Sequence, residues 1–168
     1  MMKLNIELVP RTSWYSNLRE ILTATEWNKC KKYSKLESND KCIICGGVGR
    51  KWKTECHEEW EYIEETQTQK LKSIQALCPS CHSVKHIGFS ISQNKYKSTL
   101  YHYKKINKIS SEQAEIEITN AFKLWTKRSL KEWNLDISLL LTLENLEIKN
   151  LSLRTIEKLE RKGKKNLY

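Results

Sequence analysis

The sequence Cys42-Ile-Ile-Cys45 is followed, after 32 intervening residues, by Cys78-Pro-Ser-Cys81-His82-Ser-Val-Lys-His86. Two Cys-x-x-Cys pairs in this arrangement are typical of a closed tetrahedral zinc site, because each pair bends around the metal and thiolate is a ligand that zinc prefers. We therefore assign Cys42, Cys45, Cys78 and Cys81 to one structural Zn²⁺. The alternative, four buried or disulfide-bonded cysteines, explains the duplicated spacing less well.

Two histidines follow the second cysteine pair. Pro79 suits the first turn of a helix and residues 80–85 contain no helix breaker, so a short helix is predicted here. His82 and His86 are four residues apart and share one face of that helix, next to the face that carries Cys81. Ordinary surface histidines would also fit, but ligand spacing beside a cysteine pair favours a second metal site on His82 and His86.

A third histidine, His57, precedes this helix. Residues 51–57 are compatible with a short strand and residues 73–77 with the returning strand, which makes the Glu-rich residues 58–70 an acidic loop. The order of knuckle, strand, loop, strand, knuckle and helix places His57 opposite the helix with the histidine pair. A neutral imidazole beside a divalent ion can accept a proton from water.

These motifs together, with Glu55-Cys56-His57-Glu58 between the cysteine pairs, resemble the HNH endonucleases of the ββα-metal type over about residues 40–90. The resemblance implies an α+β fold with a small ββα-metal, treble-clef-like zinc core. It also implies a single-metal nuclease that hydrolyses DNA phosphodiester bonds. By position, His57 would be the general base, and His82 and His86 would hold a catalytic divalent ion, Mg²⁺, Mn²⁺, Ni²⁺ or Zn²⁺.

Two positions depart from the family pattern. The residue before the base is usually an Asp or His that ligates the metal, and here Cys56 stands in that place as a candidate ligand. Because thiolate favours softer ions than Mg²⁺, Glu55 or Glu58 is the alternative source of a ligand atom. The middle Asn of the pattern, which orients the base histidine, corresponds to Ser73.

Composition narrows the partners and the compartment. The 168 residues carry a formal net charge of +10, which favours a polyanionic partner, nucleic acid first. The paired cysteines indicate a reducing compartment, with Cys30 as a free thiol. Neither a signal peptide nor a membrane-spanning stretch is apparent in the sequence, so we expect a cytoplasmic protein without a membrane partner.

The segments around the core are predicted to be mainly helical extensions. We divide the chain into a helical N-terminal extension (1–40), the zinc core (41–90), a helical extension that packs on the core (91–153) and a mobile basic C-terminal tail (154–168). A capping-box pattern at Ser110 starts the clearest helix. The leucine-rich end of the third segment either covers the core or forms a homodimer contact. The sequence is also compatible with a partner protein that targets the chain to DNA.

Basic residues near aromatic residues are candidates for contacts with nucleic acid. Trp14 and Tyr15 lie between two arginines, although packing of these aromatics on the core is an equally good interpretation. Lysines and tyrosines alternate in the segment after the second knuckle, where an amphipathic helix with solvated lysines is the alternative. The candidate phosphate contacts are Arg11, Arg19, Lys85, Lys104 and Lys105.

Three functions compete at this point. The first is a metal-dependent HNH endonuclease acting on DNA, with His57 as the base. The second is a catalytically inactive, zinc-stabilised module that binds nucleic acid, which the Cys56 and Ser73 departures favour. The third, a redox protein that uses its Cys-x-x-Cys pairs, leaves His82 and His86 without a role.

Overall fold

The computed structural model describes residues 3–49 and 53–165, and the chain forms a mixed α+β fold. Its centre is an antiparallel hairpin of β1 (Glu55–Ile63) and β2 (Thr68–Leu77), to which the short strand β3 (Asn134–Asp136) adds in parallel beside β2. The helices are α1 (Leu18–Ile21), α2 (Ala24–Glu37), α3 (Pro79–Lys85), α4 (Ile87–Ser92), α5 (Tyr96–Asn107), α6 (Ser111–Arg128) and α7 (Leu153–Lys165), and the 3-10 turns are Arg11–Ser13, Ser138–Leu141 and Glu144–Leu146.

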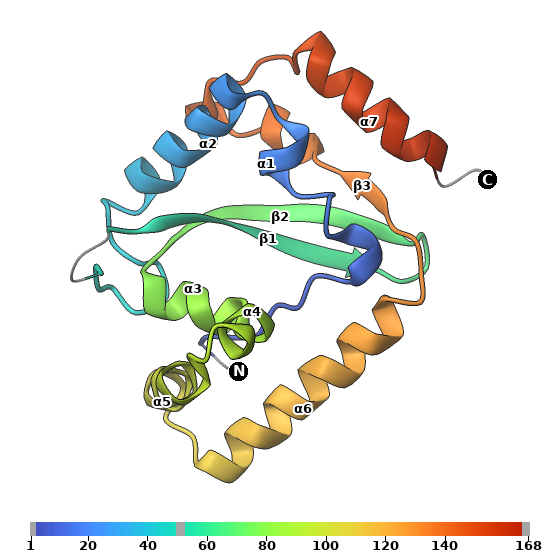
Figure 1. Cartoon of the computed structure of the whole chain (residues 1–168). Coiled ribbons are helices and arrows are strands. Elements are labelled where there is room, and N and C mark those ends of the chain that lie inside the picture. Colours follow the sequence, from blue (N-terminus) through green and yellow to red (C-terminus); the bar gives the residue numbers. More distant parts are fainter. Residues whose placement is uncertain (1–2, 50–52, 166–168) are drawn as a thin grey trace.

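The helices cover both faces of the hairpin. In Figure 1, α1 and α2 lie on one side of β1 and β2, whereas α3, α4 and α5 lie on the other side with α6 running below. Two apolar clusters match these sides. One joins Leu77 and Val84 to Tyr103 of α5 and Ile118 of α6, and the other joins Leu71 and Ile74 to α1, α2 and the leucine-rich segment.

The hairpin is longer than the sequence suggests. Residues 58–63 and 68–70, expected in an acidic loop, belong to β1 and β2, and the turn between the strands occupies only residues 64–67. Trp60 packs in the cluster on the α2 side, and Glu59 receives an ion pair from Lys72, 3.5 Å away. Because Glu61 is exposed and Glu59 is paired, these carboxylates are compatible with a strand, and the less exposed Glu58 accepts a hydrogen bond from the Leu18 N–H. Residues 51 and 52, the start of the expected first strand, lie outside the described residues.

The sequence prediction for the long helix is confirmed. Helix α6 begins after Ser110, whose hydroxyl accepts a hydrogen bond from the backbone N–H of Gln113 at 3.1 Å. The leucine-rich segment also packs on the hairpin, with Leu140 and Leu146 fully buried in the cluster on the α2 side. This burial agrees with its predicted role as a cover for the core.

The C-terminal segment, predicted as a mobile basic tail, forms helix α7 up to Lys165, and the start of this helix is hydrogen-bonded to Glu26 of α2. Residues 166–168 of the predicted tail lie outside the described residues. The Thr155 side chain is fully buried and its hydroxyl donates to Glu26 Oε2 at 2.6 Å. Ser152 donates its backbone N–H to the other Glu26 oxygen at 2.8 Å. Buried hydrogen bonds to a carboxylate anchor α7 at this point.

In the described part of the chain, no helix is both long enough and apolar enough to cross a bilayer.

Candidate functional site

The four predicted cysteine ligands come together in the structure. The Sγ atoms of Cys42, Cys45, Cys78 and Cys81 all lie within 4.8 Å of one another, so the group can hold a metal ion. All six cysteines of the chain are free thiols, which argues against the disulfide alternative. Hydrogen bonds from Cys78 and then Cys81 lower the pKa of Cys42, and the same contacts with Cys42 raise the pKa of Cys78 and Cys81, so one thiol of the group ionises at the expense of the others.

The turns at both cysteine pairs point backbone N–H groups at sulfur. Gly47 donates to Cys45 Sγ at 3.4 Å, after a turn in which Gly46 has a φ of +73°. Cys78 caps the N-terminus of α3 and accepts from the Cys81 N–H at 3.5 Å. Such N–H···S bonds spread the negative charge of thiolates, so each pair is shaped for a ligand set of this kind.

A fourth histidine, which the sequence analysis did not identify, borders this cluster. His102 Nε2 of α5 lies 3.2 Å from Cys81 Sγ. Nothing in the local sequence singles out His102, because helix packing across 21 residues creates the contact. An imidazole N–H at this distance can donate to the sulfur, as outer-shell groups do around bound metals.

The three other histidines form a second group on the α3 side of the hairpin. His57 of β1 and His82 and His86 of α3 each offer a ring nitrogen, and these atoms lie within 4.8 Å of one another. The ring centroids are 5.2 Å apart for His57 and His82, 5.1 Å for His57 and His86, and 4.8 Å for His82 and His86. The structure therefore places the predicted base opposite the predicted ligand pair.

Burial keeps the histidine pair in the form that binds metal. It lowers the pKa of His86 to about 3 and also lowers the pKa of His82. Both imidazoles are therefore neutral at pH 7, with a lone pair available for an ion. The side chain of Glu55 stands beside this pair, its Oε2 lying 2.5 Å from His82 Nδ1. This contact leaves His82 Nε2 as the free ring nitrogen and fixes the ring orientation.

Cys56 lies on the other face of the hairpin. Successive side chains of a strand point to opposite faces, and Cys56 packs in the cluster on the α2 side with Cys30. The expectation that Cys56 is a ligand of the catalytic metal is therefore corrected. Glu58 shares that face, where burial raises its pKa to about 7 although it accepts the Leu18 N–H at 3.0 Å. Of the two alternative carboxylates, only Glu55 is placed beside the histidines.

The position of the family's middle Asn is occupied by a residue that does not hold the base. The Ser73 hydroxyl donates to Glu59 Oε2 at 2.8 Å, and the Gln75 side-chain amide donates to the same oxygen at 2.8 Å. Instead, His57 contacts Glu7, whose Oε2 is 2.9 Å from His57 Nε2. Sequence reasoning missed Glu7, which is 50 residues away in the extended N-terminal segment.

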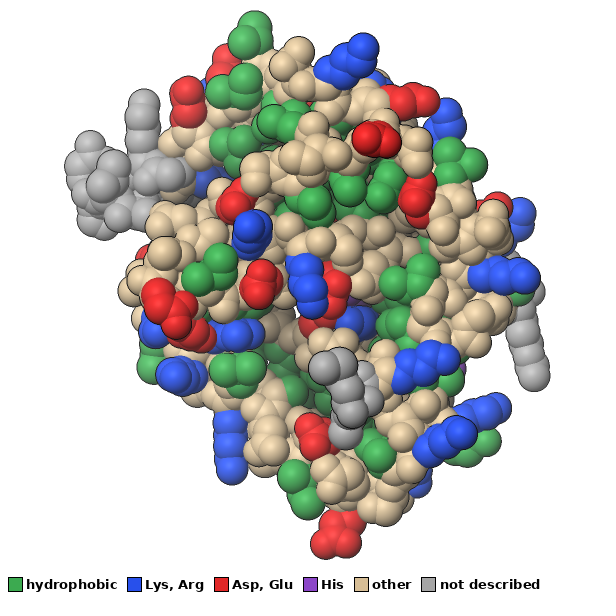
Figure 2. Space-filling model, turned by 180° about the vertical axis from the view of Figure 1, so that it is seen from behind, with side chains coloured by type: hydrophobic (Ala, Val, Ile, Leu, Met, Phe, Trp, Pro, Cys, Tyr) green, Lys and Arg blue, Asp and Glu red, His purple; other side chains and the backbone are tan. Residues whose placement is uncertain are grey.

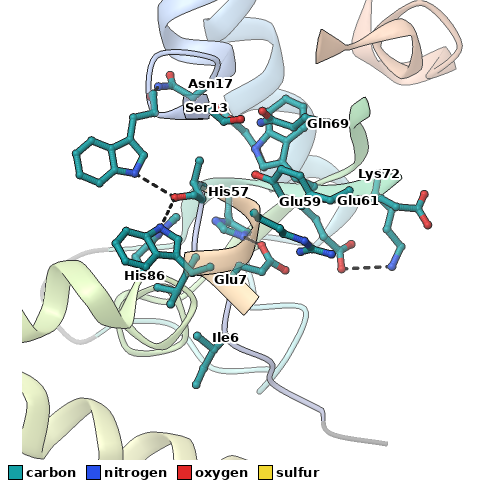
Figure 3. Close-up of a pocket in the computed structure, with 18 of the residues that line it drawn as sticks. Ile6, Glu7, Ser13, Asn17, His57, Glu59, Glu61, Gln69, Lys72 and His86 are labelled. Carbon is teal, nitrogen blue, oxygen red and sulfur yellow. Dashed lines mark hydrogen bonds and ion pairs between the residues drawn. The ribbon is translucent and has the colours of Figure 1, made fainter. Parts of the chain in front are cut away.

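A cleft of about 790 Å³ opens beside the histidine group. Figure 3 shows His57, His86 and Glu7 along one part of its wall, with Lys72 and Glu59 farther along β1 and β2. Aromatic side chains line much of the rest: Trp14, Trp27, Trp60, Tyr62 and Trp125. The charged lining consists of five carboxylates, on Glu7, Glu20, Glu58, Glu59 and Glu61, and three cations, on Arg19, Lys72 and Arg128.

The predicted phosphate contacts are scattered. Arg19 lines the cleft and lies 5.7 Å from the Trp27 ring, and Arg11 stacks over the cleft residue Trp125 at 4.6 Å. Lys104 and the exposed Lys105 belong to α5 and do not line the cleft, and Lys104 donates to Ser111 Oγ at 2.6 Å. Figure 2 shows lysines and arginines of the rear face interspersed with carboxylates.

The expectation for Lys85 is corrected. Its side chain is only 2% exposed, and its Nζ lies 2.5 Å from Glu7 Oε1 and 2.6 Å from Asn5 Oδ1. A buried cation with these partners is not presented to a phosphate. Lys85 is instead an internal cation that holds the N-terminal segment against α3.

Comparisons with known proteins add no identification. The chain matched no family model, no curated protein and no solved structure.

Proposed function

We propose that this chain is a metal-dependent endonuclease of the HNH, ββα-metal type that hydrolyses DNA phosphodiester bonds. The observation that carries the proposal is the convergence of His57 from β1 with His82 and His86 from α3, at a cleft and apart from the four-cysteine cluster. A structural zinc site needs only the cysteines. Three further imidazoles on a hairpin and its following helix supply the donors and the base that metal-assisted hydrolysis requires.

The four cysteines fit a structural Zn²⁺. Four thiol sulfurs from two knuckles provide the soft, closed, tetrahedral donor set that zinc takes in structural sites. The cluster lies where the turn before β1 meets the N-terminus of α3, so an ion there would fix the helix against the hairpin. This arrangement would hold His82 and His86 at a constant position opposite His57.

His82 and His86 fit a catalytic divalent ion, with Glu55 as the carboxylate that orients His82. When bound, such an ion would supply positive charge that stabilises the phosphate in the transition state. In the same mechanism His57 accepts a proton from the attacking water. Burial of the histidine group, with His57 3% exposed, strengthens these electrostatic effects by lowering the local dielectric.

The charge distribution indicates how DNA would approach. A net charge of +10 favours association with a polyanion. Glu59 and Glu61 line the cleft along β1 and would repel phosphates there. The scissile phosphate is therefore expected at the end of the cleft near α3, and Arg19 is the predicted arginine contact that lines the cleft.

A catalytically inactive module that binds nucleic acid is the second candidate. The observation that favours it is that Ser73 and Gln75 both donate hydrogen bonds to Glu59. Neither residue therefore orients His57, as the Asn of the HNH pattern would. The excess of carboxylates in the cleft would oppose the entry of a scissile phosphate, which also favours a module without cleavage over a nuclease.

Plasmid cleavage separates the two candidates. Purified protein with a defined zinc content would be incubated with supercoiled plasmid and Mg²⁺, Mn²⁺, Ni²⁺ or Zn²⁺, beside His57→Ala and the matched control Ser73→Ala. The nuclease proposal predicts ion-dependent cleavage that His57→Ala abolishes and Ser73→Ala retains, because Ser73 contacts Glu59 instead of His57. Binding without cleavage by folded, metal-loaded protein under all four conditions would favour the binding module.

A further inference from the structure

The extended N-terminal segment 3–10 is anchored near both of its ends by hydrogen bonds to side chains. Near its start, Asn107 of α5 accepts the Leu4 N–H at 3.0 Å and donates to the Leu4 carbonyl at 2.7 Å. Near its end, the indole N–H groups of Trp14 and Trp125 both donate to the Val9 carbonyl, at 3.0 and 2.9 Å. The segment between these anchors therefore has a defined path along the histidine group.

Glu7 is the residue of this segment that reaches His57. Its backbone N–H donates to the Lys85 carbonyl at 3.0 Å, which fixes the main chain beside α3. One carboxylate oxygen is 2.9 Å from His57 Nε2, and the other is 2.5 Å from Lys85 Nζ. Because the Glu7 side chain is only 15% exposed, these two contacts are largely shielded from water.

The two contacts have different consequences. The pair with Lys85 neutralises a buried charge and serves the fold. The contact with His57 sets the chemistry of the imidazole, because a carboxylate at Nε2 accepts a hydrogen bond and therefore keeps the proton of the neutral ring on Nε2. Nδ1 then carries the lone pair. In the other neutral tautomer Nδ1 carries the proton, so the nitrogen on the side away from Glu7 could not accept one.

We propose that Glu7 is the positioning residue of the site, which holds His57 in the Nε2–H tautomer with Nδ1 free to accept the proton of the attacking water. This inference rests on the proposed nuclease function for its catalytic part. It assigns to the N-terminal segment the orientation of the base histidine, which the Asn of the HNH pattern performs in that family. Ser73 and Gln75 do not perform it here, because they bind Glu59. Glu7 acts through His57 and is not itself a catalytic residue.

Two matched double variants isolate this role from the ion pair. Glu7→Gln/Lys85→Met and Glu7→Leu/Lys85→Met both remove the buried ion pair, but only the first retains a side-chain oxygen that can accept from His57 Nε2. Long-range ¹H–¹⁵N NMR of the zinc-loaded protein would report the His57 tautomer without substrate. Steady-state cleavage of plasmid DNA with Mn²⁺ would give kcat and KM. Asn5→Ala, which loses a Lys85 contact but keeps the carboxylate, is the control.

The Gln variant is expected to keep the Nε2–H tautomer, whereas the Leu variant gives a mixture of tautomers. The kcat of the Leu variant is expected to be roughly 10- to 100-fold below that of the Gln variant, with similar KM, because general-base catalysis typically contributes about 100- to 10,000-fold and part of it is lost when the ring populates the wrong tautomer. Identical tautomers and identical kcat in the two variants would overturn the inference while leaving the nuclease proposal intact. If wild-type protein does not cleave, a tautomer that follows the acceptor would still establish the positioning contact, and only its catalytic consequence would fail.

Discussion

Replacing Lys85 by Met is expected to destabilise the protein strongly at neutral pH. Lys85 is 2% exposed and forms the 2.5 Å pair with Glu7. Its removal leaves the Glu7 carboxylate buried without its nearest cation. Removing one member of a buried ion pair typically costs about 3–5 kcal/mol.

The electrostatics of Glu7 agree in direction with this expected loss. Burial alone would raise its pKa, but hydrogen bonds and charges from His57 and Lys85 outweigh burial and lower the pKa from 4.5 to about 2. This displacement corresponds to roughly 3 kcal/mol of folding free energy, which the contacts with His57 and then Lys85 supply together, so Lys85 accounts for only part of it. Because the folded-state pKa is lowered, the contribution is complete above pH 4.5 and is lost as the pH falls towards 2.

Urea unfolding of zinc-loaded protein, followed by tryptophan fluorescence at pH 7 and pH 4, would test this reasoning. Lys85→Met should cost the most at pH 7 and less at pH 4, where the unpaired Glu7 becomes protonated. The double variant Glu7→Gln/Lys85→Met should recover most of the loss. The exposed Lys105→Met is the matched control and should change stability by less than about 0.5 kcal/mol. A loss below about 1 kcal/mol for Lys85→Met at pH 7 would refute the reasoning.

Three further predictions concern other groups. Glu58→Gln should stabilise the protein by up to about 3 kcal/mol at pH 8 and little at pH 4. The reason is that a carboxyl whose pKa is raised from 4.5 to about 7 lowers the free energy of unfolding as the pH rises through that range. Equal urea midpoint shifts at both pH values would contradict this. His102→Ala should accelerate zinc transfer to a chromogenic chelator by removing the contact with Cys81, and an unchanged rate would assign His102 to packing alone. Glu55→Gln should weaken divalent-ion binding at His82 by roughly 10- to 100-fold in calorimetric titrations, whereas an unchanged Kd would show that the carboxylate is dispensable.

Short-range spacing accounts for what the sequence could predict. A turn sets the geometry within each Cys-x-x-Cys pair and a helix sets that of the i, i+4 histidines of α3, so each pair could be recognised from local spacing. Cys56 was the wrong candidate for the same reason that His57 was a good one, since neighbouring strand residues face opposite sides.

Contacts between distant segments could not be predicted from such rules. Glu7 reaches His57 only because the N-terminal segment is held between α5 and two indoles, and His102 reaches Cys81 only through the packing of α5 on α3. The C-terminal helix shows the same limit. Its basic sequence suggests a free tail, but the buried Thr155 binds Glu26 across 129 residues. Tertiary packing overrode the local signal in each case.

The most direct test of the proposed mechanism is the single-turnover cleavage rate of His57→Ala, measured on protein whose bound metal ions have been counted by native mass spectrometry. The mechanism assigns the proton transfer to His57 and the divalent ion to His82 and His86. It therefore predicts that the variant binds as many ions as wild-type protein and that its cleavage rate is lower by a factor of at least about 100. Loss of one bound ion would make His57 a metal ligand, and cleavage at the wild-type rate with all ions bound would contradict its role as the base.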